Sequence, residues 1–230
     1  MTVKRDRKHI LVVGASRGLG LGLTKEFLRR DYHVTATVRA AISGGGLDEY
    51  YEQLTMDTLD INSPSLTEAF LARMKNEIFD VVVLNAGIYG PREKNLSEST
   101  VEEISHVMMT NAINPVRLAE RLVPMLRPET GVMAFISSAL GSLELNANDG
   151  SELYCASKAM LNRLSRSFAT TYDYLTVLNL HPGWVRTELG GLDAPLDVET
   201  SARGMADVLE SRAGAGGHEF LDYRGKIVPW

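Results

Sequence analysis

A tyrosine and a lysine four residues apart are the side chains of this sequence best suited to acid–base chemistry. Tyr154 and Lys158 open a segment whose apolar residues have helical spacing, so both should lie on one helix face, one turn apart. These apolar residues are Met160, Leu161, Leu164 and Phe168. A neighbouring positive charge stabilises a phenolate, which would make the tyrosine a usable proton donor and acceptor. The alternative is a surface contact without function, which this spacing alone does not exclude.

A glycine-rich loop near the start of the chain is a second chemical feature. Residues 9–13 form a short apolar run typical of a buried strand, and helical spacing follows the loop as far as Leu28. Glycines let the backbone approach a pyrophosphate, and a helix N-terminus offers free N–H groups and a positive dipole end. Many turns are glycine-rich, so the flanking strand and helix patterns are what favour a phosphate site here.

The loop has the spacing G-x-x-x-G-x-G, and other motifs follow it in a fixed order. They are Asn85-Ala86-Gly87, Ser137-Ser138, the Tyr154 and Lys158 pair, and Pro182-Gly183 with Thr187. Together these motifs resemble the classical short-chain dehydrogenase/reductase family, from His9 to about Thr187. The family usually has threonine before the first glycine, where this chain has Val13. The C-terminal sequence looks most like the C-factor-like branch of carbonyl reductases.

The resemblance implies a nicotinamide dinucleotide cofactor. The cofactor-binding residues that it implies are Gly14, Ser16, Arg17, Gly18, Leu19, Gly20, Arg39, Asp60, Ile61, Asn85, Ala86, Gly87, Tyr154, Lys158, Pro182, Gly183, Val185 and Thr187. An NAD-binding protein typically carries an acidic residue at the end of the second strand, whereas this chain has Val38 followed by Arg39. Two guanidinium groups, Arg17 and Arg39, suit a 2′-phosphate, which predicts NADP over NAD. The alternative is that one or both arginines point to solvent.

The resemblance also implies a reaction and the residues that carry it out. A hydride passes between the nicotinamide and the carbonyl or alcohol group of a small molecule, with no metal ion. Tyr154 is the proton donor, and Ser138, with Ser137 as the alternative, bonds the substrate oxygen. Lys158 lowers the tyrosine pKa and holds the nicotinamide ribose, and Asn111 holds a water in the proton relay. On sequence alone, a solvent-facing asparagine is the other reading of residue 111.

A second function from a different class is an NADP-binding signalling or regulatory protein of the C-factor type. The complete set of Tyr154, Lys158 and Ser138 favours the enzyme, because a sensor would not need all three. By resemblance the chain should form a homodimer or homotetramer, with the helices bearing Asn111 and Tyr154 paired across a two-fold axis.

Composition bounds the partners and the compartment. The 230 residues carry a net charge of −5, which argues against a nucleic-acid-binding protein. No long apolar run is present, so we expect no signal peptide, transmembrane helix or membrane partner. The single cysteine, Cys155, excludes an internal disulfide and suits a reducing compartment, so we expect a cytoplasmic protein.

Strand and helix patterns alternate along the whole chain. Strands are expected at 9–13, 33–38, 54–59, 80–84, 131–136, 175–180 and 218–221, and helices at 64–76, 101–126, 152–172 and 197–211 as well as after the glycine loop. Residues 40–53 should be a loop with at most a short helix from Leu47. The alternation predicts an α/β fold, a Rossmann-type doubly wound parallel sheet of about seven strands. Residues 1–230 should form one domain, with a short substrate region at 184–196.

Overall fold

The computed structural model describes residues 7–40, 52–92, 95–145 and 151–230. These residues form a seven-stranded parallel sheet in the order β3-β2-β1-β4-β5-β6-β7. The strands are β1 (His9–Val13), β2 (His33–Val38), β3 (Leu54–Thr58), β4 (Val81–Leu84), β5 (Val132–Ile136), β6 (Thr176–His181) and β7 (Gly217–Asp222). The order reverses between β1 and β4, which confirms the predicted doubly wound sheet and places a crevice at their carboxyl ends.

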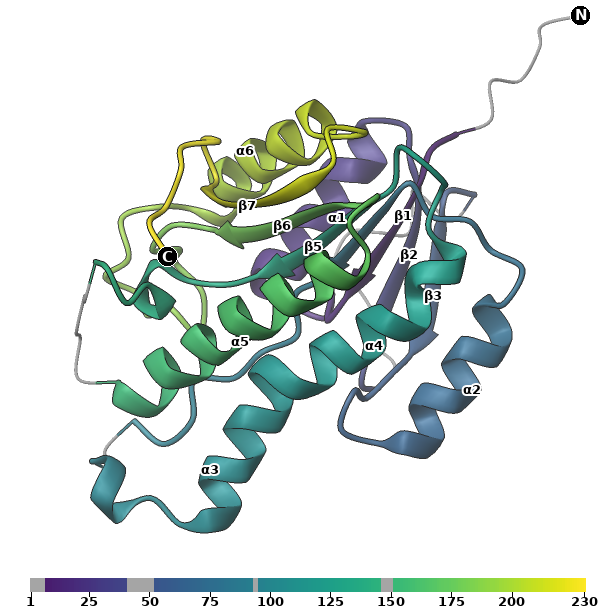
Figure 1. The fold of residues 1–230 in the computed structure, drawn as a ribbon. Helices are drawn as coiled ribbons and strands as arrows, with labels where there is room; N and C mark the ends of the chain where they lie inside the picture. The colour runs from purple at the N-terminus through teal and green to yellow at the C-terminus, as the bar shows by residue number, and fades with distance from the viewer. Residues whose placement is uncertain (1–6, 41–51, 93–94, 146–150) are drawn as a thin grey trace, which may run out of the picture.

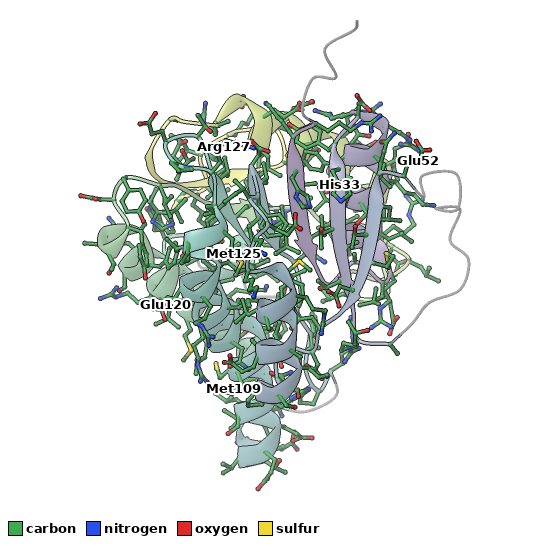
Figure 2. All side chains as sticks on the ribbon, turned by 90° about the vertical axis from the view of Figure 1, so that its right-hand side faces the viewer. His33, Glu52, Met109, Glu120, Met125 and Arg127 are labelled. Carbon is green, nitrogen blue, oxygen red and sulfur yellow. The ribbon has the colours of Figure 1, made fainter. Side chains whose placement is uncertain are left out.

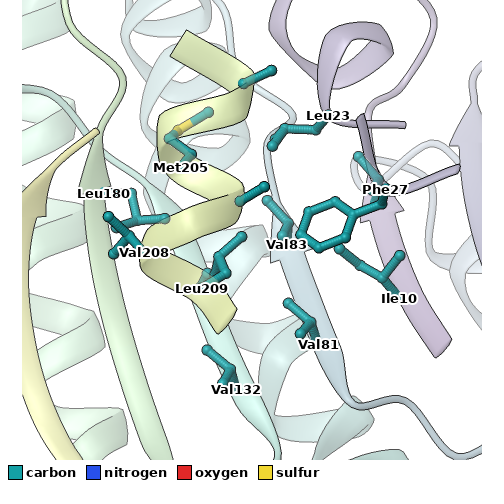
Figure 3. Packing of buried hydrophobic residues seen from close by; sticks show 14 of the residues in the cluster. Ile10, Leu23, Phe27, Val81, Val83, Val132, Leu180, Met205, Val208 and Leu209 are labelled. Atoms are coloured by element: carbon teal, nitrogen blue, oxygen red, sulfur yellow. The ribbon is translucent and has the colours of Figure 1, made fainter. Parts of the chain in front are cut away.

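Helices cover both faces of the sheet (Figure 1). One face carries α1 (Gly18–Arg29) and α6 (Val198–Ser211), and the other carries α2 (Pro64–Met74), α4 (Asn114–Leu122) and α5 (Glu152–Thr171). Figure 3 shows side chains of α1 and α6, among them Phe27 and Leu209, packed against Val83 of the central sheet. Successive residues of β1 point to opposite faces of the sheet. Val12 packs in the core beneath α1 and α6, and Val13 packs in the core beneath α2, α4 and α5. The central strands are therefore buried on both sides.

The helical spacing over residues 101–126 includes Pro115 and Pro124, which predict a bend and an early end of the helix, and the structure interrupts the helix near both prolines. The structure has α3 (Val101–Met108), a π-helical turn (Met109–Ile113), α4, and a short 3-10 turn (Val123–Met125). Figure 2 shows these segments as one column, with Met109 low on it and Met125 near its upper end. Pro115 has no N–H to continue the α-helical ladder, and the wide turn absorbs this loss. Asn111 therefore lies in the π turn.

The other elements begin and end within about two residues of their predicted bounds. Ser63 caps α2 by accepting a hydrogen bond from the N–H of Leu66 at 3.4 Å, as expected from the Asn-Ser-Pro sequence. Asp197 does the same for α6. Strand β7 is longer than predicted, from Gly217 to Asp222. Most of the loop expected at 40–53 lies outside the described residues, as does the stretch 146–150.

Candidate active site

A cleft of about 1370 Å³ lies where the carboxyl ends of the central strands meet. The predicted site residues that line it are Gly14, Ser16, Arg17, Gly18, Leu19, Arg39, Asp60, Ile61, Asn85, Ala86, Gly87, Ser138, Tyr154, Lys158, Pro182, Gly183, Val185 and Thr187. Gly20 and Asn111 lie beneath this lining. The structure thus brings segments from the whole chain to one concave surface, of the kind that ligands occupy in open α/β sheets.

The glycine loop packs too closely for side chains at two of its positions. Gly14 has a φ of +87°, and a Cβ there would lie 2.9 Å from the Cα of Ala86. A Cβ at Gly20 would lie 2.1 Å from the carbonyl oxygen of Gly14. Asn85 holds the same carbonyl with its Nδ2 at 2.7 Å, so the first and fourth βα junctions are fastened together. Gly20 is therefore needed for the close packing within the loop and does not line the cleft.

Thr37 of β2 supplies a hydroxyl to this turn. The N–H of Gly14 donates to its Oγ1 at 3.2 Å, and the N–H of Ala15 donates to its carbonyl at 2.8 Å. Val13 has no hydroxyl where the family usually has threonine, and a threonine 24 positions later (37 − 13 = 24) provides one to the adjacent amide. Sequence reasoning missed this residue because the contact crosses between strands.

The N-terminus of α1 is open toward the cleft. Its N-cap residue, Arg17, makes no side-chain capping bond, and the first turn contains no acidic side chain. The first N–H groups of a helix have no intrahelical partner, so an uncapped N-terminus is suited to an anion. The bare glycine loop and this free helix end together fit the pyrophosphate of a dinucleotide.

Arg17 and Arg39 both line the cleft, as expected for a pair that would meet a 2′-phosphate. The Nη1 atom of Arg17 lies 2.9 Å from Oε2 of Glu188, and their side chains are 65% and 71% exposed. An exposed pair of this kind is worth roughly 0–1 kcal/mol. The contact is therefore weak enough to give way to a phosphate.

Tyr154 and Lys158 lie on the first turns of α5 and are both buried. The Nζ atom of Lys158 donates to the carbonyl of Ile136 at 2.8 Å and lies 5.7 Å from the centre of the Tyr154 ring. Burial lowers the pKa of Lys158 to about 8, so the amine is still mostly protonated at neutral pH. The phenol thus has a buried positive charge beside it, the condition that favours its ionised form.

The two serines after β5 have different partners. The hydroxyl of Ser137 donates to Oδ1 of Asn162 at 2.6 Å, in a buried contact. Ser138 accepts from the N–H of Leu140 at 3.2 Å, and its O–H has no acceptor among the described residues, so this proton can be donated to a ligand. This difference favours Ser138 over Ser137 as the donor to a substrate oxygen. Asn162 lies four residues after Lys158, and this spacing on one helix face is the signal that could have identified it.

Asn111 lies beneath the cleft and fastens two segments. Its side chain accepts from the N–H of Ile88 and donates to the carbonyl of the same residue, both at 2.8 Å. Its Nδ2 also lies 2.9 Å from the hydroxyl of Ser157, on the helix that carries the tyrosine. A Cβ at Gly87 would lie 3.4 Å from Oδ1 of Asn111 and 3.6 Å from Nζ of Lys158. Asn111 is therefore buried next to the lysine, and the solvent-facing alternative is wrong.

The segment after β6 folds over the glycine loop. Thr187 accepts from the N–H of Gly190 at 2.9 Å, and a Cβ at Gly18 would lie 3.2 Å from the Thr187 methyl carbon. Trp184 is 58% exposed and donates its Nε1–H to the carbonyl of Gly190 at 2.7 Å. Residues 184–190 thus form a compact turn over one side of the cleft.

The protein-family model for short chain dehydrogenase matches residues 8–194. The chain belongs to the short-chain dehydrogenase family. It is therefore an oxidoreductase, as the resemblance predicted.

Three relatives illustrate the match. The C-signal protein of Myxococcus xanthus is 36% identical over 166 residues, which cover 70% of this chain and 99% of that protein. A short-chain dehydrogenase/reductase from Burkholderia multivorans with bound NADP is 40% identical, with a TM-score of 0.93. A carbonyl reductase from Pseudomonas aeruginosa PAO1 is 39% identical, with a TM-score of 0.91. Each of the two structural matches covers 97% of this chain and 100% of the other.

Two further features concern the described residues alone. None of their helices combines the length and the apolar character needed to cross a membrane. No group of three or more His, Cys, Asp or Glu side chains among them is placed to hold a metal ion.

Proposed function

We propose that this short-chain dehydrogenase is an NADPH-dependent reductase of small-molecule aldehydes and ketones. The observation that carries the proposal is the buried Tyr154 and Lys158 pair, which lines the same cleft as the glycine loop and Ser138. NADPH, when bound, supplies the hydride for the carbonyl carbon. The NADP-bound relative from Burkholderia multivorans and the carbonyl reductase from Pseudomonas aeruginosa support the cofactor and the substrate class.

The side chains of the protein would handle the proton. Tyr154 donates its phenolic proton to the oxygen of the carbonyl as that oxygen gains charge, and Ser138 donates a hydrogen bond to the same oxygen. The charge on Lys158 stabilises the resulting phenolate. Asn111 positions the turn beside Lys158, where the family resemblance predicts a water that returns a proton to the site.

Arg17 and Arg39 would select NADPH by pairing with the 2′-phosphate. The rest of the predicted cofactor set would hold the pyrophosphate, the riboses and the nicotinamide. We further expect a cytoplasmic homodimer or homotetramer formed through the helices that bear Asn111 and Tyr154, with residues 1–230 as one domain.

The alternative is an NADP-binding regulatory protein, which the 36% identity with the C-signal protein favours. Both functions predict NADPH binding, and only the reductase predicts consumption of NADPH. The test is the loss of NADPH absorbance with a panel of aliphatic and aromatic aldehydes and ketones. Turnover supports the reductase, binding without turnover supports the regulator, and failure to bind NADPH contradicts both.

A further inference from the structure

A tight turn beside the cleft brings the guanidinium group of Arg92 over the ring of Tyr89. Gly90 has a φ of +87°, and a Cβ at this position would lie 2.8 Å from Cγ2 of Val107 in α3. Pro91 restricts the next φ, which fixes the direction of the turn. The guanidinium carbon of Arg92 lies 4.0 Å from the centre of the Tyr89 ring. This distance is well within the range of a cation–π contact.

Tyr89 also contacts the proposed proton donor. The rings of Tyr89 and Tyr154 are stacked, with centroids 5.1 Å apart and planes inclined by 14°. Tyr89 thus contacts both Arg92 and Tyr154, and we call these three residues the arginine–tyrosine stack. All three residues line the cleft. The stack fixes the plane of the Tyr154 ring, because a stacked ring cannot rotate without losing this contact.

Arg92 also contacts the compact turn formed by residues 184–190. Its Nη2 donates to the carbonyl of Leu189 and lies 3.4 Å from the carbonyl of Glu188. Both carbonyls belong to the compact turn 184–190, which Arg17 contacts from the side of the glycine loop through Glu188. Among the described residues, no carboxylate lies within ion-pair distance of Arg92. The contacts that the described residues give this guanidinium are thus with the turn and with the ring of Tyr89.

We infer that Arg92 is a positioning residue that fastens the turn 184–190 to Tyr89 and, through Tyr89, orients Tyr154 for proton transfer. The inference rests on the proposed reductase function. Arg92 need not touch the substrate. Its loss should loosen the turn 184–190 and leave the glycine loop, which supplies part of the proposed cofactor site, in place.

The first test compares Arg92→Met with the parent enzyme. Loss of one cation–π contact and of the bonds to the turn should lower kcat/KM for a carbonyl substrate about tenfold. The fall should come mainly from a lower kcat, because a misplaced Tyr154 transfers its proton less well, and the Kd for NADPH should change less than kcat because the glycine loop is unchanged. A kcat/KM within about twofold of the parent would overturn the inference.

A second test examines whether Arg92 acts through Tyr89. Tyr89→Phe keeps the ring and should retain kcat/KM, whereas Tyr89→Leu should lose it as Arg92→Met does. The Arg92→Met/Tyr89→Leu double variant should be little worse than either single variant, because both break one connected stack. Multiplicative losses would show that the two residues act independently and would refute the positioning role.

A matched control is Arg224→Met. Arg224 also lies over a tyrosine ring, 4.9 Å from the centre of Tyr223, and neither residue lines the cleft. This variant should match the parent in kcat/KM, and a loss equal to that of Arg92→Met would overturn the inference.

Hydrogen exchange provides a readout that needs no turnover. The amides of Gly190 and Gly191 are bonded to Thr187, and their exchange should be faster in Arg92→Met than in the parent. Unchanged exchange would contradict the inference even if the parent proved to be inactive. Faster exchange in Arg92→Met, together with a parent protein that consumes no NADPH, would contradict only the reductase function. The failures of the two proposals are thereby distinguished.

Discussion

Glu188 should compete with NADPH for Arg17, which makes the cofactor preference of this enzyme adjustable at one exposed position. In the structure Nη1 of Arg17 lies 2.9 Å from Oε2 of Glu188. Binding of a 2′-phosphate at Arg17 must break or share this contact, whereas NADH has no group that requires it. The two cofactors should therefore respond differently to changes at residues 17 and 188.

The structure sets the size of each effect. Replacing Arg17 with alanine removes a charge-assisted hydrogen bond worth about 1.5–3 kcal/mol, so the Kd for NADPH should rise about 10- to 150-fold. Replacing Glu188 with glutamine removes a competing pair of two exposed side chains, which is worth no more than about 1 kcal/mol. The Kd for NADPH should then fall by up to about fivefold. The Kd for NADH should change by less than about twofold in both variants.

Fluorescence titration of each variant with NADPH and NADH measures these constants, at low and at moderate ionic strength. Arg73→Ala is the control, because Arg73 also pairs with a carboxylate, that of Asp57, and does not line the cleft. Equal weakening of NADPH and NADH by Arg17→Ala would refute the assignment of Arg17 to the 2′-phosphate. A weaker affinity for NADPH in Glu188→Gln would refute the competition.

Three further predictions concern stability. Gly20→Ala should destabilise the fold by more than about 2 kcal/mol and weaken NADPH binding, because the new Cβ would lie 2.1 Å from the carbonyl oxygen of Gly14; unchanged urea unfolding would contradict this. His9 is buried, and burial lowers its pKa to about 4. The unfolded chain therefore binds more protons than the folded protein between about pH 6.5 and 4. The free energy of unfolding should decrease as the pH falls through this range, by up to about 3 kcal/mol. His9→Gln should reduce this acid sensitivity in urea unfolding measured at neutral and acidic pH, and an unaltered pH dependence would contradict the assignment. Asn62→Ala should cost about 1–2 kcal/mol in thermal unfolding, because it leaves the buried amide of Asn114 without its acceptor at 2.9 Å; an unchanged Tm would contradict this.

Much of the fold could be predicted because its signals are local. Runs such as Val81–Leu84 are apolar throughout and are bounded by turn residues, which identifies a buried parallel strand. The glycine spacing placed the first loop, and the Tyr154 and Lys158 spacing placed both side chains on one buried helix face. These features depend only on neighbours within one or two helical turns.

The features that the sequence did not predict depend on contacts between distant residues. Pro115 predicts a bend in this helix but not the π-helical turn at Asn111, whose side chain is held by Ile88 and Ser157. The choice between Ser137 and Ser138 depends on Asn162, which is 25 residues away. No local pattern records such tertiary partners, so the sequence could nominate these residues without assigning their contacts.

The most direct test of the proposed mechanism is the turnover of Tyr154→Phe measured together with its NADPH affinity. Phenylalanine keeps the ring that stacks on Tyr89 and removes only the hydroxyl. General acid catalysis is typically worth roughly 10²–10⁴-fold, so kcat should fall by this factor while the Kd for NADPH stays close to that of the parent. Turnover within a few-fold of the parent, with a carbonyl substrate that the parent reduces, would contradict the assignment of Tyr154 as the proton donor.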